Sequence, residues 1–261
     1  MSQKFSQKPH TQIALVDNDE KVRWDRYTYV EQGSDLWHKK RSARKTDGSI
    51  QATVGSSEAG AVFPKGISKT VQGKQLRDKW RGDKTDVTDP YLLDLFAKGT
   101  AWEPVLRNEL ADLLGSVIIE PGIFEGEMVH GVELKASLDG IMRTKDGKLC
   151  VVEIKFRNYA GDVGWADEVK GERRPMGLTV FCQVQHQMRV SGIHAGLVWA
   201  GNIHGNRRLW TVRYCPEYHL MWDQYLKFFI DGGRYKRGMK KQVKVYLEMY
   251  RRQSSSEVYF E

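Results

Sequence analysis

The sequence predicts an α/β or α+β domain in which helices flank a mixed central β-sheet. Two apolar, strand-like runs, Leu134–Met142 and Leu149–Phe156, are joined by Asp146-Gly147, a dipeptide typical of hairpin turns. Two other segments, 100–114 and 178–190, carry apolar residues at helical spacing. Strands and helices therefore alternate along the chain, as expected when both pack around one core.

The N-terminal half is predicted to be mainly helical. Residues 1–27 are polar and mixed, and we expect an arm there with one short strand near 12–16. Gly55-Ser56-Ser57-Glu58 opens a helix of small residues, with serine as its N-cap. Pro90 begins another helix, because proline is tolerated in a first helical turn. The predicted helices of this half are 34–46, 56–61, 91–96 and 100–114.

The C-terminal half supplies most of the predicted sheet. Its expected strands are 116–119, 127–142, 149–156, 195–200 and 208–214. Its expected helices are 178–190, 217–230 and 240–252. We predict a single domain over residues 28–253, because a chain of this length forms one large core more readily than two, and a flexible tail over 254–261.

The composition is that of a globular chain with a basic surface. It has 261 residues, 40% hydrophobic and 28% charged, with a formal net charge of +8 and a pI near 9.3. Its basic residues cluster, and although any one cluster could equally be a solvated surface, together they favour nucleic acid as a partner. The clusters are Lys39-Lys40-Arg41, Arg44-Lys45, Arg173-Arg174, Arg207-Arg208 and Lys236-Arg237 with Lys240-Lys241.

Several protein classes are disfavoured. The chain has no apolar run long enough to cross a bilayer, and its polar start lacks the apolar centre of a signal peptide. Three widely spaced cysteines (Cys150, Cys182 and Cys215) give no disulfide framework and no zinc spacing, so a reducing cytoplasm is expected. There is no P-loop, no dinucleotide-binding glycine motif and no nucleophile elbow.

The most informative chemistry lies in Asp139 and Glu153-Ile154-Lys155, on the two apolar strands. Converging carboxylates hold a hard cation such as Mg²⁺, and the backbone carbonyl of Ile154 could add an oxygen ligand. A neighbouring lysine can hold or deprotonate a water near a phosphate. The pattern predicts a metal-dependent phosphodiester hydrolase. The alternatives are a cross-strand ion pair for Glu153 and Lys155 and a turn-forming role for Asp139, but neither explains the apolar flanks.

This site depends on the hairpin register. A two-residue turn at Asp146-Gly147 would place Asp139 opposite Ile154, on the wrong face of the sheet. A three-residue loop or a bulge would place it opposite Lys155 and diagonal to Glu153. We therefore predict that the turn is not the two-residue type.

Two further groups have competing interpretations. Glu103 follows Thr100 by three residues, so it fits a helix capping box, and a metal or water ligand there is compatible with that geometry. Gln183 and Gln187 lie four residues apart on a helix whose buried stripe is Phe181, Val184 and Met188. Their amides could orient a water or a phosphate oxygen, or they could be ordinary polar residues of a helix surface.

Six motifs, in order, make the chain resemble the phage lambda exonuclease and YqaJ-like viral recombinase nucleases. Each is weak alone, but the ordered set covers about residues 28–230 and is specific. The motifs are Val30-Glu31-Gln32-Gly33-Ser34-Asp35-Leu36-Trp37-His38-Lys39-Lys40-Arg41, Ala52-Thr53-Val54-Gly55-Ser56-Ser57-Glu58, Gly99 to Pro104, Ser137-Leu138-Asp139-Gly140, Glu153-Ile154-Lys155 and Gln183-Val184-Gln185-His186. Leu138 replaces the usual proline, and Phe156-Arg157 stands where many members have Cys-Pro.

The resemblance implies a restriction-endonuclease-like core and an Mg²⁺-dependent enzyme that degrades the 5′-ended strand of linear duplex DNA, leaving 3′ overhangs for recombination. Two ions are expected, with Mn²⁺ as a substitute. By resemblance, Asp139, Glu153 and the Ile154 carbonyl bind metal, and Glu103 supports a second ion or its waters. Lys155 positions or activates the attacking water, assisted by Gln183. Arg41 and Ser57 are implied to capture the terminal 5′-phosphate.

The resemblance also implies partners and an origin. Members of the family often form ring-shaped homotrimers that thread DNA, and work with a single-strand annealing protein. A cytoplasmic, phage- or mobile-element-encoded protein is therefore expected, with no membrane association. Two other functions remain open: a restriction-type or structure-specific endonuclease with the same core, and a basic DNA-binding module whose acid-lysine cluster is structural.

Overall fold

The computed structural model describes residues 22–42, 48–64, 73–83, 89–119, 122–145, 147–158, 176–233, 235–251 and 255–259. The strand expected near 12–16 and the basic pairs Arg44-Lys45 and Arg173-Arg174 lie outside these ranges. Within the described ranges, no helix is long and apolar enough to cross a membrane. The three cysteines are buried, and none forms a disulfide within the described ranges.

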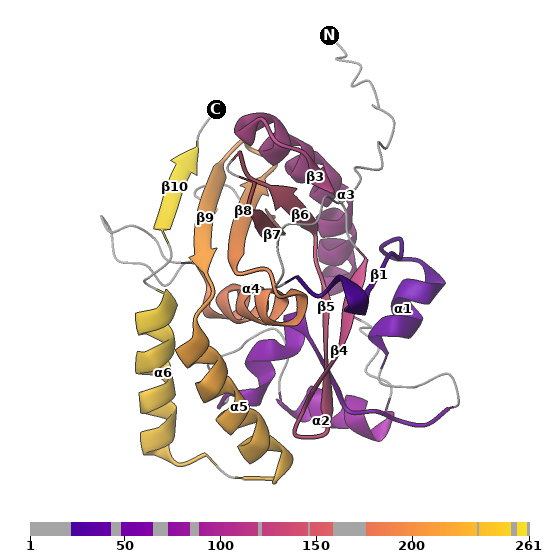
Figure 1. Ribbon diagram of the computed structural model, residues 1–261, viewed down its shortest axis with the longest axis vertical. Helices are drawn as coiled ribbons and strands as arrows, with labels where there is room; N and C mark the ends of the chain where they lie inside the picture. The colour runs from indigo at the N-terminus through magenta and orange to yellow at the C-terminus, as the bar shows by residue number, and fades with distance from the viewer. Residues whose placement is uncertain are drawn as a thin grey trace.

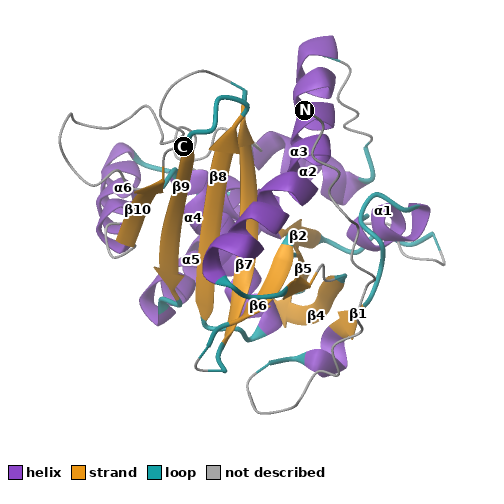
Figure 2. Ribbon diagram, turned by 90° about the horizontal axis from the view of Figure 1, so that it is seen from above, coloured by secondary structure: helices purple, strands orange, loops and turns teal. Residues whose placement is uncertain are grey.

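The described strands form two mixed β-sheets (Figures 1 and 2). In both sheets antiparallel neighbours predominate, with one parallel pair each, β7–β8 and β2–β5. The larger sheet has the order β10 (Ser255–Tyr259), β9 (Arg207–Arg213), β8 (Ala195–Asn202), β7 (Leu149–Arg157), β6 (Gly140–Arg143) and β3 (Ile118–Ile119). The smaller has the order β1 (Tyr27–Thr28), β4 (Ile123–Val129), β5 (Val132–Ser137) and β2 (Thr53–Gly55).

Helices cover both faces of the larger sheet. The α-helices are α1 (Asp35–Arg41), α2 (Gly73–Arg81), α3 (Pro90–Leu114), α4 (Leu178–Ser191), α5 (Pro216–Ile230) and α6 (Arg237–Arg251). Two 3₁₀ helices, η1 (Trp24–Arg26) and η2 (Ser56–Val62), complete the described set. Helix α3 packs on one face of β7 and β8, while α4 lies on the other face, between the two sheets. This layered arrangement confirms the predicted α/β class.

Strand β7 separates two hydrophobic clusters. Val151 belongs to the larger cluster, which includes the buried side of α4, whereas Val152 and Ile154 pack with Leu106 on the α3 side. Because successive side chains of a strand point to opposite faces, Glu153 lies on the α4 side with Val151. The predicted alternation of β7 is therefore confirmed, and it directs Glu153 and Lys155 toward α4.

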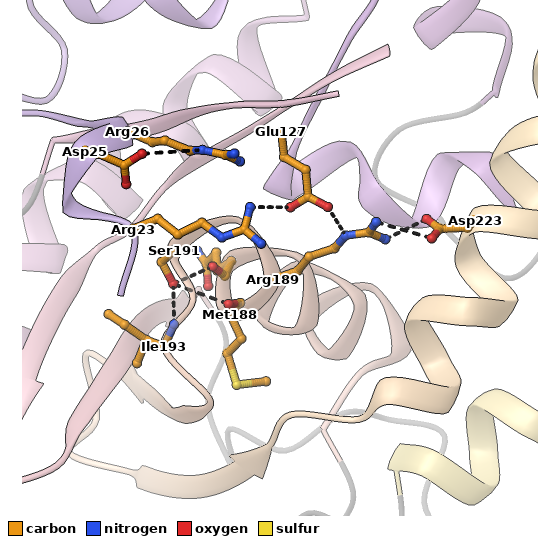
Figure 3. A network of polar contacts seen from close by, with 10 residues as sticks. Arg23, Asp25, Arg26, Glu127, Met188, Arg189, Ser191, Ile193 and Asp223 are labelled. Carbon is orange, nitrogen blue, oxygen red and sulfur yellow. Dashed lines mark hydrogen bonds and ion pairs between the residues drawn. The ribbon is translucent and has the colours of Figure 1, made fainter. Parts of the chain in front are cut away.

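Helix α4 is held in place by close packing and by a partly buried ion-pair network. A Cβ at Gly196 of β8 would come within 2.7 Å of the Val184 side chain, so glycine permits this close helix–sheet approach. Figure 3 shows Arg189 of α4 bonded to Glu127 at 2.8 Å and to both oxygens of Asp223 at 2.6 and 3.2 Å. Arg23 also donates to Glu127, so the network joins the N-terminal segment, β4, α4 and α5.

Two helix predictions are wrong in detail. The segments expected as separate helices, 91–96 and 100–114, form one continuous helix, α3, with Pro104 inside it. The missing amide of Pro104 costs one helical hydrogen bond, which the packing of Leu106 and Leu110 outweighs. The helix expected at 56–61 is the 3₁₀ helix η2, whose N-cap is Gly55 instead of a serine.

The predicted chain ends and one predicted strand also need correction. Residues 22–27, assigned to an arm, are part of the fold, because Val22 is buried and Tyr27, with Thr28, pairs with β4. The expected flexible tail contains β10, which pairs along β9. The long strand expected at 127–142 is instead three strands, because His130-Gly131 turns the chain and Leu138-Asp139 interrupts it.

Candidate active site

Glu153 is the centre of the candidate site. Its side chain is fully buried, and each carboxylate oxygen accepts a hydrogen bond from a glutamine of α4. Gln183 Nε2 lies 2.6 Å from Glu153 Oε1, and Gln187 Nε2 lies 2.6 Å from Oε2. Lys155 also donates to Oε1. A buried carboxylate is costly unless it is fully hydrogen-bonded, so this environment fixes Glu153 in one orientation.

Asp139 meets this group through the hairpin of β6 and β7. Gly140 pairs with Val152 and Arg143 with Leu149, and Thr144 continues the pairing through its hydrogen bond to Lys148. The loop therefore spans three residues, 145–147, which confirms that the turn is not the two-residue type. The expected partner was wrong, because this register places Asp139 level with Glu153 instead of Lys155.

The backbone of Ile154 points toward Asp139. Its N–H donates to Asp139 Oδ2 at 2.8 Å. In a β-strand, the N–H and C=O groups of one residue point to the same edge of the strand. This is why two opposite residues of an antiparallel pair can exchange both of their hydrogen bonds. The Ile154 carbonyl therefore faces the Asp139 edge of β7, where the sequence predicts an oxygen ligand.

Burial, followed by mutual repulsion, disfavours the charged forms of two carboxylates at this edge. Burial, then repulsion from Glu153, raises the pKa of Asp139 to about 7, against the opposing effects of Lys155, the Ile154 amide and Arg107. Burial and the charge of Asp139 likewise raise the pKa of Glu103 to about 7. A cation bound between these groups would relieve this repulsion.

Lys155 is held as a charged hydrogen-bond donor. Burial opposes its charge, but the carboxylates of Glu153 and Asp139 outweigh burial and raise the pKa of Lys155. Its side chain is 27% exposed, whereas that of Glu153 is 0% exposed. The ammonium group thus lies where the buried carboxylate meets solvent, a position from which it can orient a water or a phosphate oxygen.

Glu103 does not cap a helix. It lies inside α3, so the capping-box interpretation is wrong, and its carboxylate takes part in a separate polar cluster. Arg107, one turn further along α3, donates to Oε1 at 2.5 Å, and Gln32 donates to Oε2 at 3.2 Å. Asp139 is close enough to raise the pKa of Glu103, which places Glu103 at the border of the site.

Arg41 lies beside the same carboxylates. Burial lowers its pKa, while the charges of Glu58, Asp139 and Glu153 act in the opposite direction. Its guanidinium stacks 4.1 Å from the centre of the Trp37 ring, and the Trp37 indole N–H donates to Ser137 Oγ at 3.2 Å. These contacts fix the C-terminal end of α1 against the end of β5, two residues before Asp139.

Ser57 lies in η2, next to Glu58. The Glu58 carboxylate accepts the Gly55 amide at 2.8 Å and pairs with Lys79 at 2.8 Å. Within the described residues, no hydrogen bond joins Arg41 to Ser57. Glu58 is close to both residues, because it follows Ser57 in the chain and its charge opposes the lowering of the Arg41 pKa.

Sequence reasoning did not assign a site role to several residues that hold this arrangement. The four-residue spacing indicated Gln187 together with Gln183, but only Gln183 was assigned to the site, and Gln187 contributes as directly. Arg107 follows Glu103 at the same spacing, which also could have indicated the pair. The contact between Gln32 and Glu103 joins residues 71 apart in sequence, so local sequence patterns could not reveal it.

The residues present fit a hard cation with an incomplete set of protein ligands. Across the described ranges, no three side chains from His, Cys, Asp and Glu gather closely enough to hold a metal ion by themselves. Two carboxylates, Asp139 and Glu153, with the Ile154 carbonyl supply oxygen donors. Mg²⁺ commonly keeps several waters and takes only one or two carboxylates from a protein, so this donor set suits it.

Comparison with known proteins identifies the family of the chain. The model of the YqaJ-like viral recombinase domain matches residues 36–194, more than half of the chain. The chain belongs to the YqaJ-like viral recombinase domain family. The matched segment contains all of the predicted site residues, from Arg41 to Gln183. No curated protein matches the sequence closely enough to name a relative.

Solved structures share the fold of this family member. An alkaline exonuclease from Laribacter hongkongensis is similar with a TM-score of 0.52 and 16% identity, over 84% of this chain and 97% of the other. The structure of the same exonuclease in complex with dAMP is similar with a TM-score of 0.53, at the same identity and coverage. Family and fold together support a nuclease of the phage lambda exonuclease type.

Proposed function

We propose that this protein is an Mg²⁺-dependent 5′→3′ exonuclease that degrades one strand of linear double-stranded DNA. The product would be a 3′ single-stranded overhang that serves recombination by strand annealing. The observation that carries the proposal is the buried Glu153 carboxylate, fixed by Gln183 and Gln187, with Lys155 and Asp139 beside it. Family membership supports DNA as the substrate.

Each side chain has a distinct task in this proposal. Asp139, Glu153 and the Ile154 carbonyl would hold the metal, with Glu103 supporting a second ion or its waters. Bound Mg²⁺ would supply charge stabilisation for the phosphate and its leaving oxygen. Lys155 orients the attacking water and the scissile phosphate, because its ammonium group donates hydrogen bonds from the edge of the site. Gln183 and Gln187 hold the Glu153 side chain in place by hydrogen bonds and leave its charge intact.

Recognition of a DNA end is assigned to Arg41 and Ser57. Arg41 is held on Trp37 close to the carboxylates, so a terminal 5′-phosphate bound there would place the neighbouring phosphodiester at the site. A guanidinium binds a phosphate through paired hydrogen bonds. We include a homotrimeric ring and a single-strand annealing partner in the proposal, on the strength of the family alone.

The test uses linear duplexes that carry either a 5′-phosphate or a 5′-hydroxyl, incubated with Mg²⁺ or with EDTA. The proposal predicts metal-dependent release of nucleotides, faster from the phosphorylated end, and a covalently closed circle that stays intact. Equal rates from both ends would overturn the roles of Arg41 and Ser57. Cleavage of the circle would indicate an endonuclease, and no hydrolysis of any substrate would leave the protein as a DNA-binding module.

A further inference from the structure

Helix α6 has three distinct faces. Val243 and Leu247, four residues apart, are buried in the larger hydrophobic cluster and fix the orientation of the helix. About a quarter-turn away lies an exposed face of basic residues. These residues, called the basic face below, are Arg237, Lys240, Lys241 and Lys244. The remaining exposed side carries apolar residues, among them Val245 and Met249.

The basic face differs from other basic clusters of the chain. In α1, Lys40 pairs with Glu125 and Arg41 stacks on Trp37. In β9, Arg207 is buried and forms two hydrogen bonds to Glu109, at 2.6 and 2.8 Å. The four cations of the basic face form no ion pair within the described part of the chain. Lys40, Arg41 and Arg207 thus have partners inside the fold, whereas the four residues of the basic face are exposed.

The spacing of this face matches a phosphate backbone. Arg237 and Lys244 are seven residues apart, so the face extends about 10.5 Å along the helix. Phosphates of one DNA strand advance about 3.4 Å each along the duplex axis, so about three of them cover the same length. Unpaired cations bind such a chain of phosphates by releasing its condensed counterions, and need no base contact.

We infer that the basic face of α6 binds the phosphate backbone of duplex DNA, at a distance from the candidate active site. In both views α6 and α1 lie on opposite sides of the molecule (Figures 1 and 2), so this contact involves DNA remote from the end held near Arg41. The inference extends the proposed function, because it assigns a second contact to the same substrate. It concerns binding alone and involves no hydrolysis.

The experiment measures DNA binding in EDTA, so that no strand is degraded. The variant is Lys240→Gln/Lys241→Gln/Lys244→Gln. The matched control, Lys74→Gln/Lys145→Gln/Lys227→Gln, removes three exposed lysines of α2, the 145–147 loop and α5. The probe is a blunt duplex of about 40 base pairs, roughly 136 Å long at 3.4 Å per base pair, which exceeds the reach of one protein molecule. Affinity is measured over a range of salt concentrations.

The α6 variant is expected to reduce the slope of log K against log salt by about 0.9 for each phosphate that it no longer binds, and by up to about 2.7 for three phosphates. The control should keep the wild-type slope. Equal slopes for wild type and the α6 variant, or an equal reduction of the slope in both triple variants, would overturn the inference.

A second measurement separates DNA from other partners of a basic helix. Binding to vesicles of phosphatidylcholine and phosphatidylglycerol is compared for the same three proteins. A loss confined to vesicles would assign the face to a membrane surface and overturn the DNA contact. Nuclease assays on the same preparations keep the two proposals apart. An inactive wild type with an α6-dependent slope would remove only the proposed function, whereas an active enzyme with an unchanged slope would remove only this inference.

Discussion

Helix α4 carries two polar clusters whose charges are balanced differently. At its C-terminal end, Arg189 lies between Glu127 and Asp223. Burial disfavours the charge of Arg189, but these acids outweigh it and raise its pKa. One turn earlier, Gln187 and Gln183 fix Glu153, yet the neighbouring Asp139 keeps a pKa of about 7 because burial and Glu153 oppose its charge.

We propose that this difference distinguishes a structural cluster, around Arg189, from a catalytic one, around Glu153. An ion pair that is complete within the protein needs no ligand, and mutating it should affect stability first. A group of carboxylates with unbalanced charge has affinity left for a cation and strains the fold without one. The following predictions test whether the two clusters divide in this way.

The largest expected effect is on hydrolysis. Lys155→Ala should reduce the rate of DNA degradation by roughly 10²–10³-fold or more, because a positioned charged donor is lost from the reacting phosphate. Binding of DNA should change little, whereas the melting temperature should fall, because the buried Glu153 loses its charged donor. Lys145→Ala, an exposed lysine of the 145–147 loop, is the control. Full activity of Lys155→Ala would show that the acid-lysine cluster is structural.

The balanced cluster should respond in stability. Arg189→Ala leaves Glu127 and Asp223 without their shared cation, and we expect a loss of about 3 kcal/mol in the free energy of unfolding. Urea denaturation measures this loss. Arg81→Ala, which removes a 70%-exposed partner of Asp78, should cost less than about 1 kcal/mol. If both variants were equally stable, the network in Figure 3 would not support the fold.

The same region should make stability fall in acid. Burial, followed by the charge of Arg189, lowers the pKa of His186 to about 3 and of His219 to about 2. Below pH 6.5 these histidines bind protons in the unfolded chain but not in the folded one. Each should therefore lower the free energy of unfolding by up to about 1.4 kcal/mol per pH unit as the pH falls toward 3. Comparing urea denaturation at pH 7.5 and 5.0 for wild type and His219→Phe isolates one histidine. An identical pH dependence in the two proteins would contradict the assignment.

The smallest expected change in stability has the opposite sign. Asp139→Asn removes one of two opposed carboxylates and keeps an oxygen for the Ile154 amide. Without divalent metal, the free energy of unfolding of this variant should be about 0.5–1 kcal/mol higher than that of wild type. It should also lose hydrolysis. Asp112→Asn, on α3 away from the site, should leave both quantities unchanged. A loss of stability in Asp139→Asn would show that the carboxylate is balanced after all.

The elements that carry strong periodic patterns were predictable from the sequence. Strand β7 and helix α4 are close to their expected limits, and β7 directs Glu153 and Lys155 to one face as expected. The three-residue hairpin loop followed from requiring a convergent site. The residue opposite Asp139 did not follow from it. A three-residue loop can place Asp139 opposite either Glu153 or Lys155, and only the observed strand register distinguishes the two.

Other features depend on contacts between distant segments. Local sequence favoured a helix start at Thr100, but the packing of Leu106 and Leu110 against the sheet supports one helix through Pro104. The supports of Glu103 and Glu153 come from residues 71 and 34 positions away in the chain, Gln32 and Gln187. Such contacts need the fold as a whole. The predicted roles of Arg41, Ser57, Glu103 and the metal ligands stay predictions.

The central claim is our proposal that Asp139 and Glu153 form an anionic site that binds a divalent cation. The most direct measurement is the melting temperature of wild type and Asp139→Asn as Mg²⁺ is added, at constant ionic strength. We predict that Mg²⁺ raises the melting temperature of wild type and has no effect on Asp139→Asn, because only a ligand bound to the folded state stabilises it. An equal response of the two proteins, or none in wild type, would contradict the account.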